Sequence, residues 1–319
     1  MILMVSGRTD IIAFYTKWFM NRYKEGFVDV RNPFYKKMIS RMYFNDVDLI
    51  MFCTKNPIPI VKHLKDIKNK ILFHVTLTPY HKDIEPNLPP KGKIIEAIKE
   101  ISKIIGKENL YIRYDPIFIS DKYNTNYHVK SFDHMCKLLN GYVNKIIVSY
   151  MDEYKNTIKN KKILKYKTMS EDDFKTIGKE FSRIAKENNM TVQSCFEKRT
   201  LTEYGFINRP CLSKELAYSL TGKKFKLWQA RKCKCVEMAD IGVYNSCKHL
   251  CKYCYANFDE TAIDNNMKNH DPNSSLLVGH VQEDDEIKIR KWTRRSIYGN
   301  WYWKIKRRFN WLLWNCFVL

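Results

Sequence analysis

The feature that most limits the fold of this chain is a repeated pattern of short apolar runs, each ending in polar residues and followed by a helical stretch. Seven of these runs have strand length: residues 2–5, 27–30, 48–53, 71–75, 110–112, 145–148 and 191–193. Strands that are apolar throughout are buried on both faces, as parallel strands are. The pattern therefore predicts a parallel sheet with helical connections.

Four of the connecting segments have the apolar spacing and end signals of helices, namely residues 11–24, 93–105, 127–139 and 170–187. Thr9 or Asp10 can cap the first of these, and Gly26 follows its end. Strands and helices alternating in this number predict an α/β fold, a (β/α) TIM-like barrel that is complete or partial. A doubly wound open sheet is the alternative.

Two further segments and the overall division complete the predicted organisation. Residues 38–44 interrupt the alternation and suggest a small hairpin or an added strand, and residues 236–241 are a candidate eighth strand. We expect a (β/α) barrel core over 1–197 and a cysteine-rich segment over 198–295 that completes the barrel and binds one or more iron-sulfur clusters. A basic and aromatic tail then covers 296–319.

Charged side chains follow several of the predicted strands. Asp10, Lys55, Arg113 and Asp115 are our candidate catalytic residues. Each of them alone is better explained as a helix cap or a salt bridge. Their joint placement is informative, because the carboxyl ends of the strands carry the active site in barrel enzymes.

Three cysteines lie within eight residues near the C-terminal end: Cys247, Cys251 and Cys254, with Tyr253 just before the third. Three thiolates on one loop can hold three irons of a 4Fe-4S cluster and leave the fourth iron without a protein ligand. An open iron beside an aromatic ring is what reductive cleavage of S-adenosylmethionine (SAM) requires, and the spacing resembles the radical-SAM motif. The alternative is a structural zinc knuckle completed by a distant cysteine or by His249.

Four cysteines precede this motif: Cys195, Cys211, Cys233 and Cys235. Four thiols suffice for a closed site, either a second 4Fe-4S cluster or a zinc ion held by four thiolates. The other cysteines, Cys53, Cys136 and Cys316, have apolar neighbours, which favours packing.

Several short motifs carry a family resemblance. They are Ser-x-Arg-Thr-Asp at 6–10, Val-Arg-Asn-Pro at 30–33, Thr-Lys-Asn-Pro at 54–57, Thr-Leu-Thr-Pro-Tyr at 76–80, Arg-Tyr-Asp-Pro at 113–116 and the cysteine motif within 240–257. With them the chain resembles the bacterial domain-of-unknown-function family 1848 over about residues 1–295. The resemblance implies a radical-SAM-like protein. Radical-SAM enzymes usually carry the cysteine motif after the first barrel strand, whereas here it comes last.

Two classes of function follow from these observations. The first is a radical-SAM-like enzyme of unknown substrate, which needs an electron donor such as a flavodoxin or ferredoxin. The second is a non-catalytic binding module, stabilised by zinc or an iron-sulfur cluster, with nucleic acid as a candidate ligand.

Charge and cysteine usage bear on the compartment. Ten cysteines without a signal-like N-terminus predict the reducing cytosol. The net charge is +22, and nine cations unopposed by any acid lie between residues 288 and 308. Residues 301–319 mix seven aromatics with four cations, which suits peripheral contact with an anionic membrane or with nucleic acid. This tail is too short and too charged to span a bilayer.

Overall fold

The computed structural model describes residues 1–195, 197, 199–229 and 233–291. Within them, Met1–Ile289 forms one compact unit. The predicted tail over 296–319 and Cys316 lie outside the described residues. Every helix found in the described ranges is too short or too polar to cross a membrane.

The strands of the described chain are β1 (Ile2–Val5), β2 (Phe27–Arg31), β3 (Met38–Tyr43), β4 (Leu49–Thr54), β5 (Lys70–Thr76), β6 (Leu110–Ile117), β7 (Lys145–Tyr150), β8 (Thr191–Ser194), β9 (Ile207–Asn208), β10 (Ala239–Asp240) and β11 (Glu286–Ile289). The α-helices are α1 (Ile11–Phe14), α2 (Thr16–Glu25), α3 (Lys91–Ile105), α4 (Thr125–Leu139), α5 (Lys155–Lys159), α6 (Lys161–Leu164), α7 (Glu171–Glu187), α8 (Lys214–Thr221) and α9 (Glu260–Lys268). Short 3-10 helices cover Phe44–Asp46, Ile58–Asp66, Lys107–Asn109 and Thr202–Tyr204.

An eight-stranded parallel sheet forms the centre of the α/β fold, in the order β10-β1-β4-β5-β6-β7-β8-β9. From β1 to β9 the strand order follows the chain, without the reversal of a doubly wound sheet. β9 and β10 are the two edges, and among the described residues they do not pair with each other. A closed barrel is therefore not shown.

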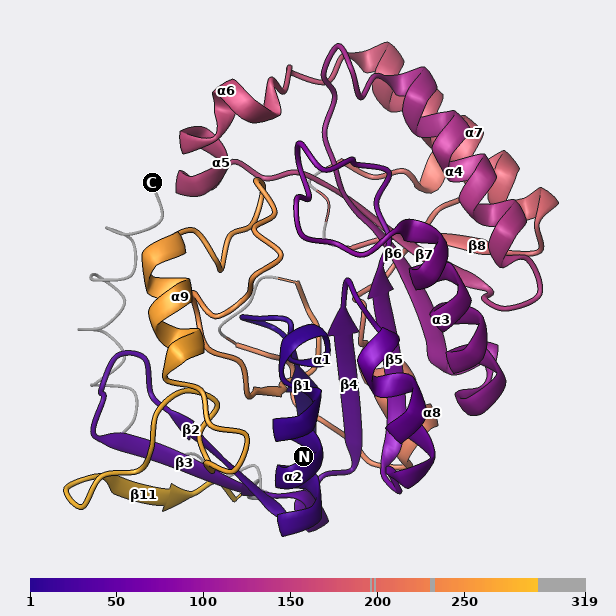
Figure 1. Cartoon of the computed structure of the whole chain (residues 1–319). Helices are drawn as coiled ribbons and strands as arrows, with labels where there is room; N and C mark the ends of the chain where they lie inside the picture. Colours follow the sequence, from indigo (N-terminus) through magenta and orange to yellow (C-terminus); the bar gives the residue numbers. More distant parts are fainter. Residues whose placement is uncertain (196, 198, 230–232, 292–319) are drawn as a thin grey trace. The chain divides into compact units, whose positions relative to one another are not determined.

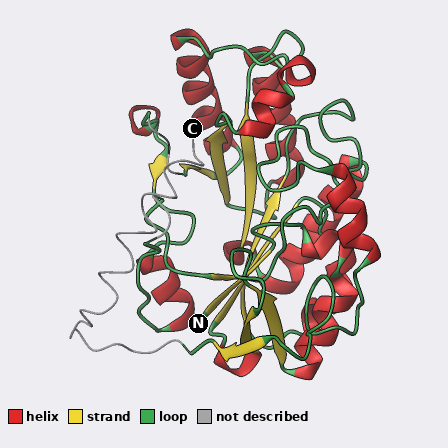
Figure 2. Cartoon of the chain, turned by 90° about the vertical axis from the view of Figure 1, so that its left-hand side faces the viewer, coloured by secondary structure: helices red, strands yellow, loops and turns green. Residues whose placement is uncertain are grey.

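Helices cover one face of this sheet. Figure 1 shows α3, α4 and α7 in series alongside the strands, and Figure 2 shows the strands flanked by helices. The other face packs against the segment that contains α8: Leu212, Ala217 and Val236 lie in one buried cluster with residues of β1, β4, β5, β6 and β7. Both faces are thus buried, which explains the continuous apolar runs of these strands.

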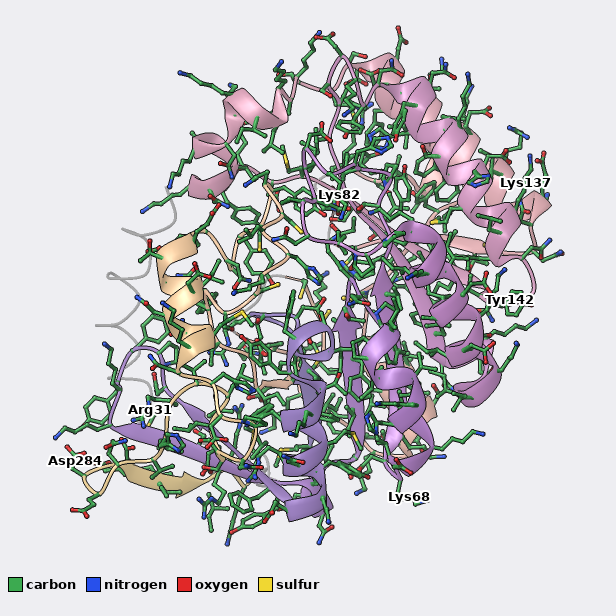
Figure 3. All side chains as sticks on the ribbon, in the orientation of Figure 1. Arg31, Lys68, Lys82, Lys137, Tyr142 and Asp284 are labelled. Atoms are coloured by element: carbon green, nitrogen blue, oxygen red, sulfur yellow. The ribbon has the colours of Figure 1, made fainter. Side chains whose placement is uncertain are left out.

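A second sheet has the order β11-β3-β2. Residues 38–43 form a single strand that pairs antiparallel with β2, so of the two alternatives for residues 38–44 the added strand is confirmed. The assignment of residues 27–30 to the large parallel sheet was wrong, because this run pairs with β3 instead. Arg31 Nη2 donates to Asp285 Oδ2 at 2.7 Å and ties β2 to the loop before β11; Figure 3 labels Arg31 and its near neighbour Asp284 in this region.

The helix expected over residues 11–24 is present but divides at Tyr15, where φ is −132°. Asp10 caps α1 by accepting a hydrogen bond from the Ala13 backbone N–H, and Gly26 ends α2 at φ +85°. Because this left-handed conformation is costly for residues with a Cβ, glycine is suited to the position. The candidate eighth strand is present as β10, and β9 was not predicted.

Candidate metal and cofactor site

The loop of residues 247–254 follows β10 and is held by contacts from the start of the chain. Tyr15 donates its hydroxyl hydrogen to the Ser246 carbonyl at 2.6 Å. The Asn257 side chain accepts from the Ser246 backbone N–H at 2.8 Å and donates to the Arg8 carbonyl at 3.1 Å. Since Arg8 follows β1, these bonds place the loop at the carboxyl end of that strand.

The three thiols of the loop are largely shielded from water. Cys247 and Cys251 are buried and Cys254 is partly buried. Burial raises the pKa of Cys247, although a hydrogen bond from the His249 backbone acts in the opposite direction. The Asn257 amide donates to Cys254 Sγ at 3.7 Å. Backbone and amide N–H groups that donate to sulfur tune the thiolates that bind a metal.

Glu85 is a buried carboxylate beside the loop, and its side chain is only 1% exposed. Lys55 Nζ lies 2.8 Å from Glu85 Oε1, and Lys91 Nζ bonds the other carboxylate oxygen. Thr78 and Tyr253 donate their hydroxyl hydrogens to Oε1 as well. Burial acts to raise the pKa of Glu85, but the two lysines hold it down at about 2.

Lys55 connects the Glu85 carboxylate to the cysteine loop. Lys55 Nζ lies 5.3 Å from the centre of the Tyr253 ring, a cation–π distance. Burial lowers the pKa of Lys55, but Glu85 and then Cys251 outweigh this effect, so the pKa is raised. Lys55 therefore stays charged between Glu85 and the cysteine loop.

Asp10 is held from three directions. Its carboxylate accepts from the Thr54 hydroxyl at 2.7 Å, from the Lys55 backbone N–H at 2.8 Å and from His249 Nε2 at 3.0 Å. The His249 ring packs against Phe14 in a tilted arrangement, with ring centroids 4.7 Å apart and an interplanar angle of 57°. His249 Nδ1 is buried and has no hydrogen-bond partner in the described part of the chain. Asp10 thus joins β1, β4 and the cysteine loop as a positioning group.

Arg113 and Asp115 form an ion pair at the end of β6, with Arg113 Nε 3.0 Å from Asp115 Oδ2. Burial lowers the pKa of Arg113, but Asp115 and the nearby Cys211 and Cys195 raise it well above its usual range. Asp115 also contributes to the raised pKa of Lys55. The four candidate catalytic residues therefore lie on the same side of the molecule, on or just after the strands β1, β4 and β6.

The four earlier cysteines come together although they are spread over forty-one positions of the chain. Cys195 Sγ donates to Cys211 Sγ at 3.5 Å, and Cys211 Sγ lies 3.5 Å from Cys235 Sγ. Cys235 also has a side-chain hydrogen bond with Cys233. Hydrogen bonds from Cys195 and Cys235 lower the pKa of Cys211 well below its usual range.

Two cavities open beside these groups. One of about 570 Å³ lies at the ends of β6, β7 and β8, and its lining includes Ser149, Tyr150, Asp152, Cys195 and Glu197. Burial raises the pKa of Glu197 to about 7. The other, of about 620 Å³, lies beside the cysteine loop, and its lining includes Asn156, Asn160, Cys251, Lys252 and Asn257.

Sequence reasoning missed part of the site. Glu85, Lys91 and Thr78 were not among the candidates, yet Glu85 bonds both Lys55 and Tyr253, and Lys91 and Thr78 bond Glu85. Within the described ranges, no group of three or more His, Cys, Asp or Glu side chains is arranged to hold a metal ion as it stands. The assignment of cysteines to metal therefore stays a prediction.

Taken together, the chain is an α/β protein whose parallel sheet carries a cysteine-rich loop and a buried ion-pair cluster at the carboxyl ends of its strands. A family model described as a domain of unknown function (DUF1848) matches residues 2–256. Because the match covers most of the chain, the chain belongs to this family. A search of the curated proteins gives no match.

Proposed function

We propose that the chain is a radical-SAM-like enzyme in which Cys247, Cys251 and Cys254 hold a 4Fe-4S cluster that binds SAM. The observation that carries the proposal is the Cys-x3-Cys-x2-Cys loop at the carboxyl end of parallel strands, beside the buried Lys55 and Glu85. When bound, the cluster would pass one electron to SAM, breaking its carbon–sulfur bond to give methionine and a 5′-deoxyadenosyl radical. The eight-stranded sheet would then serve as a partial barrel.

The residues around the loop fit such a cluster. An iron-sulfur cluster on three thiolates is negatively charged, and a buried charge needs compensation. Lys55 and Lys91 carry two positive charges, whereas Glu85 carries one negative charge, so one cation is left to face the cluster. The ring of Tyr253 would pack near the adenine of SAM.

The substrate would occupy the cavity of about 570 Å³ at the ends of β6, β7 and β8. Arg113 and Asp115 lie at the end of β6 and would orient it, while Lys55 and Asp10 would act nearer the cysteine loop. A flavodoxin or ferredoxin in the cytoplasm would supply the electron. Peripheral contact with an anionic membrane or with nucleic acid would be a role of the tail, residues 296–319.

The alternative is a non-catalytic binding module in which the cysteines only stabilise the fold. The net charge of +22 favours a nucleic-acid ligand for such a module. Metal analysis and the response to SAM together separate the two classes, because a binding module stabilised by an iron-sulfur cluster would also contain iron. The enzyme should be brown, contain iron and change the electron paramagnetic resonance spectrum of its reduced cluster when SAM is added. Colourless protein with zinc and no iron at the Cys247 loop would favour the binding module.

A further inference from the structure

The thiols of Cys195, Cys211, Cys233 and Cys235 form a continuous chain of sulfur contacts. Cys195 Sγ and Cys211 Sγ are 3.5 Å apart, and so are Cys211 Sγ and Cys235 Sγ. Cys195 and Cys233, the outer two of these four thiols, are only partly buried, as is Cys211.

These distances distinguish between the two kinds of metal site that four thiols can form. A tetrahedral ion with zinc–sulfur bonds of about 2.3 Å holds its sulfur ligands about 3.8 Å apart. A four-iron cluster attaches each thiolate to a different iron and therefore spreads the sulfurs more widely. We propose that Cys195, Cys211, Cys233 and Cys235 bind a single zinc ion between the two edge strands of the parallel sheet, β9 and β10.

The four cysteines lie next to the strands at the two edges of the sheet, so a zinc ion bound by them would hold these edges together. Cys195 directly follows β8, and Cys211 lies three residues after β9. Cys233 and Cys235 lead into β10, which begins at Ala239. Since β9 and β10 are the opposite edges of the sheet, an ion shared by these cysteines joins the two edges without any strand pairing between them.

The surroundings favour a metal over four free thiols. Cys211 Sγ lies 3.5 Å from both Cys195 Sγ and Cys235 Sγ, so each of these two pairs is already close to the sulfur spacing around a tetrahedral ion. Four thiolates around Zn²⁺ leave a net charge of −2, and Arg113 supplies a positive charge close to Cys195 and Cys211.

All four ligand positions of the ion are taken by protein, so this site is closed and structural. It is independent of the cluster proposed at Cys247, Cys251 and Cys254. The test therefore uses the Cys247→Ala, Cys251→Ala, Cys254→Ala triple variant, in which any remaining metal belongs to the second cysteine set.

Metal content is measured in this triple variant and in the same protein with Cys211→Ala added. The proposal expects about one zinc ion per chain in the triple variant and its loss after Cys211→Ala. Cys136→Ala in place of Cys211→Ala is the matched control, because Cys136 is a buried cysteine on α4, and it should retain the zinc. About four irons in the triple variant, or no metal at all, would overturn the proposal.

Two measurements without the Cys211 substitution cover the case in which that variant does not fold. Cobalt(II) exchanged into the triple variant should give the intense absorption of tetrahedral thiolate coordination, and its absence would count against the site. Removing zinc with a chelator should then speed up hydrogen exchange at the backbone amides of β9 and β10. Exchange at the amides of α4 should stay slow. Unchanged exchange at both strands would refute the bridging role.

Discussion

Replacing Glu85 with Gln tests the buried ion-pair cluster beside the cysteine loop. The change keeps the size of the side chain but leaves Lys55 and Lys91 without their shared carboxylate. Removing one partner of a buried ion pair costs about 3–5 kcal/mol. The Lys55 and Lys91 side chains are 15% and 33% exposed, so solvent screens part of this cost and we take the lower end, about 3 kcal/mol.

At about 2.1 cal/mol/K of unfolding entropy per residue, that loss lowers Tm by about 4 °C for a chain of this length. Urea and thermal unfolding of the anaerobically purified protein measure both quantities. Glu96→Gln is the control, because the Glu96 side chain is 71% exposed and its pair with Lys99 should contribute no more than about 0.5 kcal/mol. A loss below about 1 kcal/mol for Glu85→Gln would refute the assignment of Glu85 as the charge centre of this cluster.

Three further variants address the cofactor, the substrate and the core. Tyr253→Ala should weaken SAM binding while iron content stays near that of the wild type; equal losses of both would contradict a contact between the ring and SAM. Arg113→Lys should preserve iron content and lower product formation, and an insoluble variant would make the Arg113–Asp115 pair structural. Burial lowers the pKa of His128 to about 4, so its neutral form stabilises the fold above pH 6.5. That contribution, about 3 kcal/mol, should be lost as pH falls from 6.5 to 4, and unfolding of His128→Gln should lack this pH dependence.

The central strands were predictable because burial on both faces leaves a continuous apolar run. Residues 49–54 and 70–76 are examples, and both form neighbouring parallel strands. The run at 27–30 contains Asp29, and this interruption was the available signal against a place in the parallel sheet. Arg41 Nη2 pairs with Asp29 Oδ2 at 2.8 Å across the β2–β3 hairpin, so local pairing decided the position of the strand.

The site was predictable only where its functional residues lie close together in the sequence. The Cys247 loop has a spacing that can be read directly, whereas Glu85 lies between β5 and α3 without a distinguishing motif. The Glu85 carboxylate is bonded by Lys55, thirty residues earlier in the chain, and by Tyr253, near the far end of the described chain. The approach of Cys195 to Cys211 and Cys235 likewise depends on how β8, β9 and β10 are arranged, which no spacing encodes.

Turnover of SAM by the reconstituted protein tests the central claim most directly. With a strong reductant, the wild type should convert SAM to methionine and 5′-deoxyadenosine, and Cys136→Ala should do the same. The Cys247→Ala, Cys251→Ala, Cys254→Ala triple variant should release neither product, because no cluster is left to pass an electron to SAM. Unchanged cleavage by the triple variant, or no cleavage by wild-type protein that carries a full complement of iron, would contradict the account.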